Sequence, residues 1–315
     1  MRSLIALLCA LALPAVAQDY PSKPIRIIIG YSAGGGNDII VRSMSNEMSK
    51  SLGQPVIIEN KPGAQSIIAA EYVAKAPPDG YTVLMGPSGP MTINPATYSK
   101  LPYDPVRDFA PVSMISTFPL IAVVSASGPI KSIGELVDYA KKNPGKANYS
   151  SSAGIFQIAT ELFKQRTGTD FVMIPYKGSG ESVQAVIGGQ VTVTLVDPPP
   201  AAGPIKGGSV RPIAVTASKR HPGFPDVPTM AEAGVRDMEV PVWTAFFLPA
   251  KTPQSIVARL QKETARVVQT PEVRERFAGM GIEPVGGTAE ELAKQVTSDI
   301  AKWTAVAKAA NIKND

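Results

Sequence analysis

The sequence has very few residues of the kinds that bind metals or act as nucleophiles. Its 315 residues include one cysteine, Cys9, and one histidine, His221. A single thiol excludes an intramolecular disulfide, and the chain contains no H-E-x-x-H pattern and no aspartate cluster of the calcium-loop type. We therefore expect no metal site and no cofactor, and a fold whose stability comes from the burial of apolar side chains.

The sequence also lacks an apolar run long enough to cross a bilayer, which takes roughly 20 residues. The run Leu4–Leu13 is shorter, it follows Arg2, and Ala15-Val16-Ala17 after it has the small-x-small pattern of a cleavage site. We expect residues 1–17 to be a signal peptide that is cleaved after Ala17. The soluble mature protein would then be located in the periplasm.

Charge of one sign is not concentrated anywhere in the chain. The formal net charge is +5, but lysine and arginine do not form a run. Basic patches or runs are the usual signature of proteins that bind nucleic acid. We therefore expect no nucleic-acid partner.

The sequence offers little for serine catalysis. A serine triad needs a histidine base, and His221 lies in the loop-like stretch Arg220–Gly223, far in sequence from every serine-rich turn. The G-x-S-x-G pattern of a nucleophile elbow does not accompany it. We expect a protein that is not an enzyme, with a secreted serine hydrolase acting on a carboxylate ester as the alternative.

Apolar β-branched runs alternate with segments of helical spacing along most of the chain. Strand Ile25–Ile29, the glycine break Gly34–Gly36 and helix Ile39–Leu52 form the first such unit. The repeated alternation predicts an α/β fold with parallel, doubly wound sheets. Pro198–Pro200 is expected to interrupt the series as a stiff turn.

The length of the chain indicates two lobes, because 315 residues with 44% apolar content exceed a single comfortable core. After the alternating series the chain is helical and amphipathic to its end, and this part is expected to pack on the first lobe. Leu120–Val124 and Trp243–Leu248 would cross between the lobes as a two-strand hinge. The expected division is residues 18–122 with 242–315 for lobe 1, and residues 123–241 for lobe 2.

The first glycine-rich segment lies between an expected strand and an expected helix. Glycine lets backbone N–H groups approach a ligand closely, and a helix start carries partial positive charge, so this loop is suited to a carboxylate. The alternative is a tight turn with Asp38 as the helix N-cap. A dinucleotide site is a poorer match, because Ile39 stands where the last glycine of G-x-G-x-x-G would be. The candidate ligand residues in this segment are Tyr31, Ser32, Ala33, Gly34, Gly35, Asn37 and Asp38.

The stretch Ser150–Gly154 repeats this arrangement in the second lobe. Its hydroxyl and N–H groups are suited to the far end of a ligand, although a serine turn that only caps a helix is the alternative. Both loops follow the carboxyl ends of strands, where open α/β sheets bind their ligands. The candidates from this and other turns are Ser88, Ser151, Ser152, Ala153, Tyr176 and Asp197.

Short motifs occur in order along the chain between residues 21 and 234. They are Pro21–Ile25, Gly34–Asp38, Glu59–Ala64, Ala76–Tyr81, Leu101–Pro105, Asp108–Val112, Val172–Gly178, Ile187–Val191, Asp226–Thr229 and Glu232–Gly234. Together they resemble the Bug receptors, the extracytoplasmic solute-binding proteins of tripartite tricarboxylate transporters. The resemblance covers essentially the whole mature chain.

This resemblance implies a type II periplasmic-binding fold whose two lobes close over a small carboxylate. Carried over by position, the ligand loops are Tyr31–Asp38, the turn with Ser88, and Ser151–Gln157, and Asp197 matches the strand-end aspartate of the family. Where the family commonly has a serine-histidine pair, this chain has Phe156 and Gln157. The implied partners are the carboxylate and, transiently, membrane transporter subunits, with the receptor itself a monomer.

Overall fold

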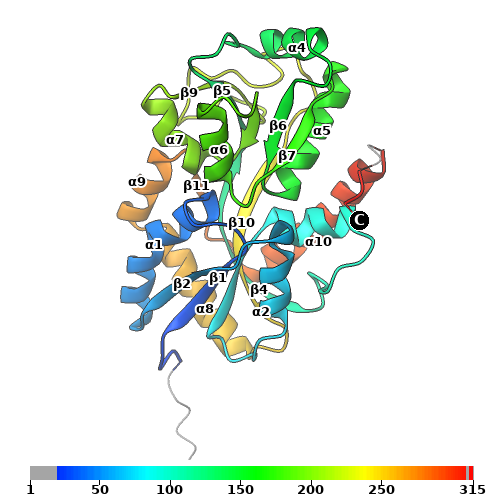
Figure 1. Cartoon of the computed structure of the whole chain (residues 1–315). Coiled ribbons are helices and arrows are strands. Elements are labelled where there is room, and N and C mark those ends of the chain that lie inside the picture. The colour runs from blue at the N-terminus through cyan, green and yellow to red at the C-terminus, as the bar shows by residue number, and fades with distance from the viewer. Residues whose placement is uncertain (1–19, 310–311, 315) are drawn as a thin grey trace, which may run out of the picture.

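The computed structural model describes residues 20–309 and 312–314. The expected signal peptide and its cleavage after Ala17 lie outside these residues. Figure 1 shows two lobes, one made from the blue-to-cyan and orange-to-red parts of the chain and the other from the green parts. Every helix in the described ranges is too short or too polar to span a bilayer.

The first lobe contains a six-stranded sheet in the order β11-β4-β10-β3-β1-β2. Its strands are β1 (Ile25–Ile29), β2 (Val56–Asn60), β3 (Thr82–Pro87), β4 (Phe109–Pro119), β10 (Pro241–Pro249) and β11 (Glu283–Pro284). β1 pairs in parallel with β2 and β3, whereas β10 is antiparallel to β3 and β4. The sheet is therefore mixed and not wholly parallel as expected, because β10 returns from the other lobe in the opposite direction.

Helices pack on both faces of this sheet. They are α1 (Gly36–Leu52), α2 (Ile67–Ala74), α3 (Asn94–Thr97), α8 (Gln254–Val268), α9 (Pro271–Gly279) and α10 (Ala289–Ala309), with the short turns η1 (Ala64–Ser66) and η2 (Gly89–Ile93). α8 contacts α1 and β4, and α10 contacts β4 and α3. The helical last part of the chain thus packs on the first lobe, as expected.

Strand β1 shows why an unbroken apolar run suits this position. Ile27 and Ile29 belong to the hydrophobic cluster that includes Met44 of α1, whereas Ile28 belongs to the cluster of Ala69 in α2. Successive side chains of a strand point to opposite faces, so a strand that is covered on both faces needs apolar residues throughout.

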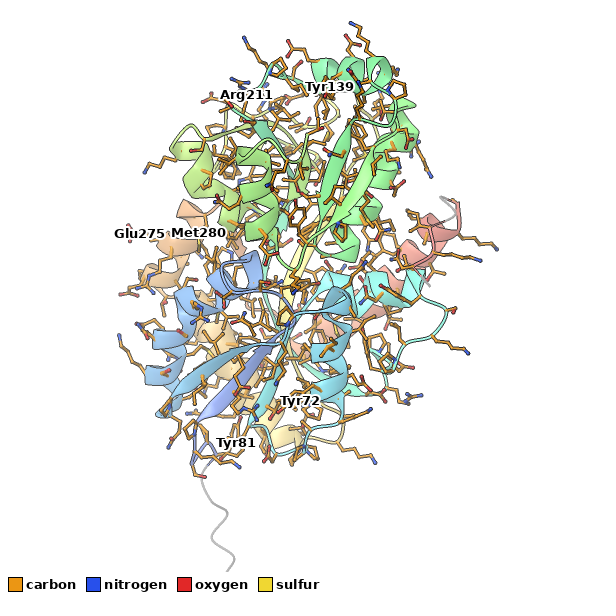
Figure 2. All side chains as sticks on the ribbon, viewed as in Figure 1. Tyr72, Tyr81, Tyr139, Arg211, Glu275 and Met280 are labelled. Atoms are coloured by element: carbon orange, nitrogen blue, oxygen red, sulfur yellow. The ribbon has the colours of Figure 1, made fainter. Side chains whose placement is uncertain are left out.

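The second lobe contains a three-stranded sheet in the order β8-β5-β9 and a parallel pair, β6 and β7. Its elements are β5 (Ile121–Ser125), α4 (Ile133–Lys142), β6 (Asn148–Ser151), α5 (Gly154–Thr167), β7 (Val172–Pro175), α6 (Ser179–Ile187), β8 (Thr194–Val196), α7 (Pro198–Lys206) and β9 (Val210–Val215). Arg211 fixes the far end of this lobe, donating to the carbonyls of Ile130 and Ala126 at 2.9 and 3.1 Å. In Figure 2 it lies at the opposite end of the molecule from Tyr72 and Tyr81 of the first lobe.

The prolines Pro198–Pro200 begin helix α7 and do not form the expected turn. Proline is compatible with the first turn of a helix, because the N–H groups there have no intrahelical acceptor to lose. The rigid entry also fixes Asp197, the residue immediately before the helix.

The chain crosses between the lobes at Leu120 and Val240. Leu120 separates β4 of the six-stranded sheet from β5 of the three-stranded sheet, and Val240 precedes β10. The expected hinge segment Trp243–Leu248 instead lies inside the six-stranded sheet, where β10 pairs with β3 and β4. From this strand membership we propose Leu120 and Val240 as the boundaries between the two lobes.

Thr216 joins the two crossing points to each other. Its backbone N–H donates to the carbonyl of Leu120 at 2.9 Å, and its carbonyl accepts from the N–H of Val240 at 3.0 Å. Its hydroxyl accepts from the N–H of Leu120 at 2.9 Å and donates to the carbonyl of Val240 at 3.1 Å. The side chain is buried, so water does not compete for these four hydrogen bonds.

Replacing Thr216 with valine should lower the free energy of unfolding by about 2 kcal/mol, because valine keeps the shape but leaves a buried N–H and a buried carbonyl unsatisfied. Chemical denaturation measures the change. Thr297→Val is the matched control, since its hydroxyl also donates to a carbonyl, that of Ala293, but on the exposed face of α10. Equal decreases in the free energy of unfolding for both variants would show that the hinge bonds stabilise the fold no more than an exposed hydroxyl bond does.

Candidate ligand-binding site

A cavity lies between the two lobes, where several loops of both lobes meet. The residues that line it are Tyr31, Gly36, Asn37, Pro87, Gly89, Phe118, Ser152, Ala153, Ile155, Phe156, Ser179, Asp197 and Val242. The cavity measures about 20 Å³, which by volume suits a single water molecule. The lobes therefore stand in a closed arrangement around a small space.

Three helices begin at this cavity: α1 at Gly36, α5 at Gly154 and α6 at Ser179. The residues before them are glycine or alanine, and over the described residues none of these N-caps makes a side-chain bond to its helix. A helix start that lacks a capping side chain leaves N–H groups for an outside acceptor and carries partial positive charge. The convergence of three such starts favours an anion.

Unpaired polar atoms from three different loops lie on the cavity wall. Among the described residues, the hydroxyls of Tyr31 and Ser152 and the Oδ1 atom of Asp197 are buried and have no hydrogen-bond partner. Burial raises the pKa of Tyr31 well above its usual range, so its hydroxyl stays a neutral donor. Such groups are costly to leave unpaired, and a polar ligand would satisfy them.

Asp197 has an unusual environment for a carboxyl group. Its side chain is only 4% exposed, and burial raises its pKa to about 6, with only partial compensation from the Ser179 hydroxyl. Its Oδ2 atom lies against Gly36, at the start of α1. Near neutral pH this group can therefore change between a neutral donor and a buried anion.

The two lobes touch directly beside the cavity. The N–H of Ser32 donates to the carbonyl of Lys177 at 3.3 Å, and the N–H of Gly36 donates to Oγ of Ser179 at 3.2 Å. A Cβ atom at Gly180 would lie 2.6 Å from the carbonyl oxygen of Gly34, closer than real Cβ contacts come. Glycine at these positions is what allows the lobes to approach so closely.

The structure brings five of the sequence-predicted site residues onto the cavity wall: Tyr31, Asn37, Ser152, Ala153 and Asp197. Others lie next to it without lining it. Gly35 is the N-cap of α1, and the hydroxyl of Ser151 donates to the carbonyl of Ala153 at 3.1 Å. Ser88 is buried before η2, and its hydroxyl has no hydrogen-bond partner in the part of the chain that the structure describes.

The remaining predicted residues, Ser32, Ala33, Gly34, Asp38, Gln157 and Tyr176, do not line the cavity. Asp38 shows the reason most clearly, because its carboxylate accepts from the Gly34 N–H, the Arg42 guanidinium and the Asn60 amide. Burial alone would raise the pKa of Asp38, but these bonds together lower it. Asp38 thus stabilises the loop from within the first turn of α1, but it is not the helix N-cap of the alternative interpretation, because that position is Gly35.

Several lining residues were not among the predicted ligand residues. Gly36, Ile155 and Phe156 lie inside the predicted ligand loops and Pro87 and Gly89 flank Ser88, whereas Phe118, Ser179 and Val242 lie outside every predicted loop. Gly36 stood within the predicted loop and could have been included. Ser179 stands at a helix start shortly after a strand, as does the Ser150–Gly154 turn from which Ser151 and Ser152 were predicted. Phe118 and Val242 sit next to the crossing points, and no local motif distinguishes them from other apolar strand residues.

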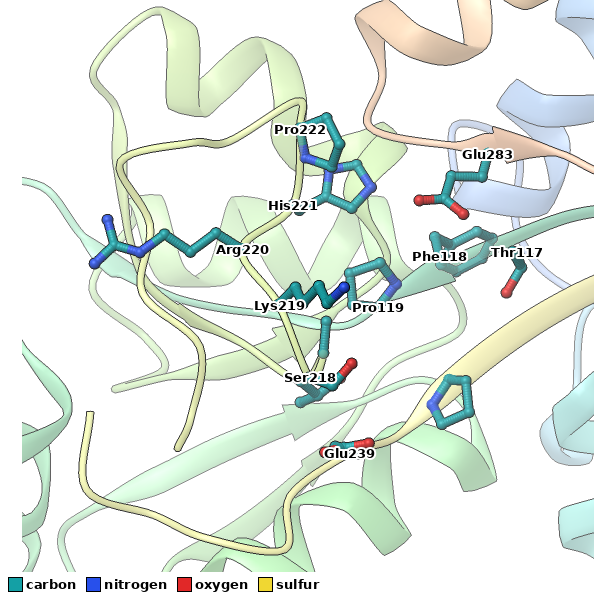
Figure 3. Close-up of a pocket in the computed structure, with 13 residues that line it drawn as sticks. Thr117, Phe118, Pro119, Ser218, Lys219, Arg220, His221, Pro222, Glu239 and Glu283 are labelled. Atoms are coloured by element: carbon teal, nitrogen blue, oxygen red, sulfur yellow. The ribbon is translucent and has the colours of Figure 1, made fainter. Parts of the chain in front are cut away.

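A second, more open pocket of about 390 Å³ lies on the hinge side. Figure 3 shows His221 and Glu283 on opposite sides of it, with Ser218 and Lys219 along the loop that carries His221. Nδ1 of His221 accepts from the Gly223 N–H at 3.1 Å, and burial lowers the pKa of His221. Although this pocket is larger, it lacks helix starts, so we assign the ligand to the cavity between the lobes.

The family of this chain is shown by comparison with known proteins. A profile described as "Tripartite tricarboxylate transporter family receptor" matches residues 40–312. The chain belongs to this receptor family. The Bug resemblance is also confirmed, since protein BugT of Bordetella pertussis is 33% identical over 306 residues, covering 96% of this chain and 94% of BugT.

Solved structures agree with this membership. MatC from Rhodopseudomonas palustris with bound malate has a TM-score of 0.87 at 32% identity, covering 91% of this receptor and 99% of MatC. The R. palustris protein Rpa4515 with adipate has a TM-score of 0.90 at 35% identity, covering 94% and 99%. The periplasmic binding protein BugD has a TM-score of 0.91 at 30% identity, covering 94% and 100%. The expected two-lobed α/β fold of a periplasmic binding protein is thus confirmed.

Proposed function

We propose that this receptor captures a small dicarboxylate between its lobes in the periplasm and delivers it to the membrane subunits of a tripartite transporter. The observation that carries this proposal is the convergence of three uncapped helix starts on one buried cavity. One carboxylate of the ligand is bound at the start of α1 in the first lobe by the N–H group of Asn37, because the Gly36 N–H already donates to Oγ of Ser179. The other lies at the start of α5, beside Ser152.

Two kinds of similarity support the choice of ligand. MatC and Rpa4515, at 32% and 35% identity, were solved with malate and adipate, which are both dicarboxylates. The cavity of this chain offers neutral donors from Tyr31 and Ser152, and the described residues that line it include no lysine or arginine. Recognition therefore depends on N–H and O–H groups, which suit either dicarboxylate, and the cavity of about 20 Å³ must widen when such a ligand enters.

The remaining parts of the proposal concern the whole protein. The chain is exported with its signal peptide removed after Ala17, acts as a monomer and contacts transporter subunits only transiently. It has no catalytic activity. His221 lies in the hinge-side pocket, away from the serine turns of the cavity, so the hydrolase alternative lacks a base for its nucleophile.

Thermal-shift and calorimetric screening of the mature protein tests this proposal, with malate, adipate, citrate, an amino acid and a neutral sugar as probes. A dicarboxylate present at a hundred times its Kd should stabilise the folded state by about 2.7 kcal/mol. The sugar is the negative control. Stabilisation by the sugar alone, or turnover of a carboxylate ester, would reject the receptor assignment for this cavity.

A further inference from the structure

A chain of side-chain amides links the two lobes outside the cavity. Nε2 of Gln65, in the first lobe, donates to Oε1 of Gln157 at 3.4 Å, and Nε2 of Gln157 donates to Oδ1 of Asn314 at 2.9 Å. Gln157 is in α5 of the second lobe, whereas Gln65 and Asn314 belong to parts of the chain that pack on the first lobe. The Gln157 side chain thus uses both its donor and its acceptor to contact the opposite lobe.

Asn314 is held in place by the first lobe independently of Gln157. Its backbone N–H donates to the carbonyl of Thr97 at 2.9 Å, and its Nδ2 donates to Oγ1 of Thr97 at 3.2 Å. Ile312, two residues earlier, packs on the main hydrophobic cluster and donates its N–H to the carbonyl of Ala307 at 2.9 Å. The amide oxygen of Asn314 is therefore presented to the second lobe from a fixed position.

Gln65 is fixed as well, by an uncommon backbone conformation. Ala64, Gln65 and Ser66 have φ values of 46°, 50° and 70°, in the left-handed region that residues with a Cβ atom rarely adopt. Nδ2 of Asn94 donates to the carbonyl of Gln65 at 3.0 Å and so helps to hold this turn. Strained backbone of this kind persists where the surroundings dictate it, and it is frequent at functional sites.

Gln157 lies within the first turn of α5, close to the cavity. Ile155 and Phe156, the residues just before it, line the cavity, while the Gln157 side chain points to Gln65 and Asn314 instead. A hydrogen bond between Gln157 and the first lobe therefore also keeps the start of α5 at the wall of the cavity. When the lobes separate, Gln157 must leave both partners, because these are attached to the first lobe.

We propose that Gln157 and Asn314 form a latch that holds the closed receptor shut and sets how long the ligand remains bound. This proposal rests on the proposed function, since it concerns release of the same ligand. The latch exists only in the closed form, so it slows ligand dissociation and has little effect on ligand entry. Gln157 is a positioning residue here and does not contact the ligand itself.

Stopped-flow kinetics with adipate as the probe tests the latch in Gln157→Ala and Asn314→Ala. Because each variant loses hydrogen bonds made only in the closed form, the dissociation rate should rise about fivefold, with the association rate unchanged within about twofold. The double variant should match Gln157→Ala, since that substitution already removes the bond to Asn314 together with the bond to Gln65. The first control is Gln295→Ala, because the Gln295 amide donates within α10, to Asp299. The second is Lys313→Ala, because Lys313 is exposed and lies next to Asn314 in sequence.

A measurement without ligand separates the latch from the proposed function. The mature sequence lacks cysteine if residues 1–17 are removed, so cysteines placed at Lys50 and Lys142, both exposed and on opposite lobes, can carry spin labels. The inter-label distance distribution should shift toward open forms in Gln157→Ala but not in Gln295→Ala. Unchanged distances together with unchanged dissociation would overturn the latch, whereas failure of the wild type to bind any carboxylate would overturn the proposed function alone.

Discussion

Replacing Gly36 with valine will abolish ligand binding while both lobes remain folded. A Cβ atom at this position would lie 2.5 Å from Cγ of Asp197 and overlap its Oδ2 atom. Asp197 is buried and leads directly into the prolines of α7, so it has little room to withdraw. The two lobes then cannot close, so a ligand bound to one lobe loses all of its contacts with the other.

The expected loss of affinity is at least about 100-fold, which corresponds to about 2.7 kcal/mol. Calorimetry measures the affinity, and small-angle scattering measures closure, because the wild type should become more compact with saturating dicarboxylate whereas Gly36→Val should not. Helix α1 itself tolerates valine at its first position, where the backbone is not left-handed. Circular dichroism should therefore show an unchanged fold.

Two further variants make this test specific to closure. Gly180→Ala places a Cβ atom 2.6 Å from the carbonyl oxygen of Gly34, so it blocks closure without altering the cavity lining. Gly203→Val lies in α7, where no described atom beyond the neighbouring helix backbone comes within 4 Å of the added Cβ, and this variant should bind normally. If Gly36→Val and Gly180→Ala both bind and compact like the wild type, closure of the lobes is not required for binding.

Local patterns were sufficient for much of the fold. Strand Ile25–Ile29 and the helix after it were predicted correctly, because the spacing of apolar residues along the sequence shows directly which faces of a strand or helix are buried. β4 was missed because Phe109–Pro119 is bounded and interrupted by prolines, and its pairing with β10 joins residues far apart in sequence. Long-range pairing of this kind leaves no local signal, so Trp243–Leu248 of β10 was predicted as a strand but its partner β4 was not.

For the candidate site, the sequence indicated which loops lie together but not how their side chains are oriented. The glycine loop and the serine turn do reach one cavity, because both follow strand ends that meet where the lobes join. The orientation of Asp38 and Gln157 was not predictable, since it depends on Arg42, Asn60 and Asn314, which approach from other elements. Two of the loop glycines are required for different reasons. Gly34 adopts a left-handed φ of 77°, whereas a Cβ atom at Gly36 would overlap Asp197.

Asp197 should make the affinity for a dicarboxylate fall as the pH rises from 6 to 8. Its pKa of about 6 means that the carboxyl group is about half neutral at pH 6 and almost wholly ionised at pH 8. The neutral form donates a hydrogen bond to a ligand carboxylate, whereas the ionised form repels it in a buried space. Calorimetry with adipate or malate over this range should show a decrease of about tenfold or more, since one pKa unit corresponds to a factor of ten.

The same ionisation should destabilise the ligand-free protein. A carboxyl group with a higher pKa in the folded than in the unfolded state binds more protons when folded, so the free energy of unfolding falls as the pH rises through that interval. For Asp197 the interval runs from 3.8 to about 6, and the full cost above it is about 3 kcal/mol. This cost is present at neutral pH and absent below pH 4.

Replacing Asp197 with asparagine removes the ionisation but keeps a neutral donor of similar shape. The variant should bind dicarboxylates with an affinity that is flat between pH 6 and 8, and its melting temperature should exceed that of the wild type at pH 7.5 but not at pH 4. Asn148→Ala, at the surface end of β6 away from the cavity, controls for general changes in stability. A ligand that carries an ammonium group reverses the sign, because it needs the ionised aspartate as its partner. Tighter binding at higher pH and loss of binding in Asp197→Asn would therefore identify an amino acid, and not a dicarboxylate, as the solute.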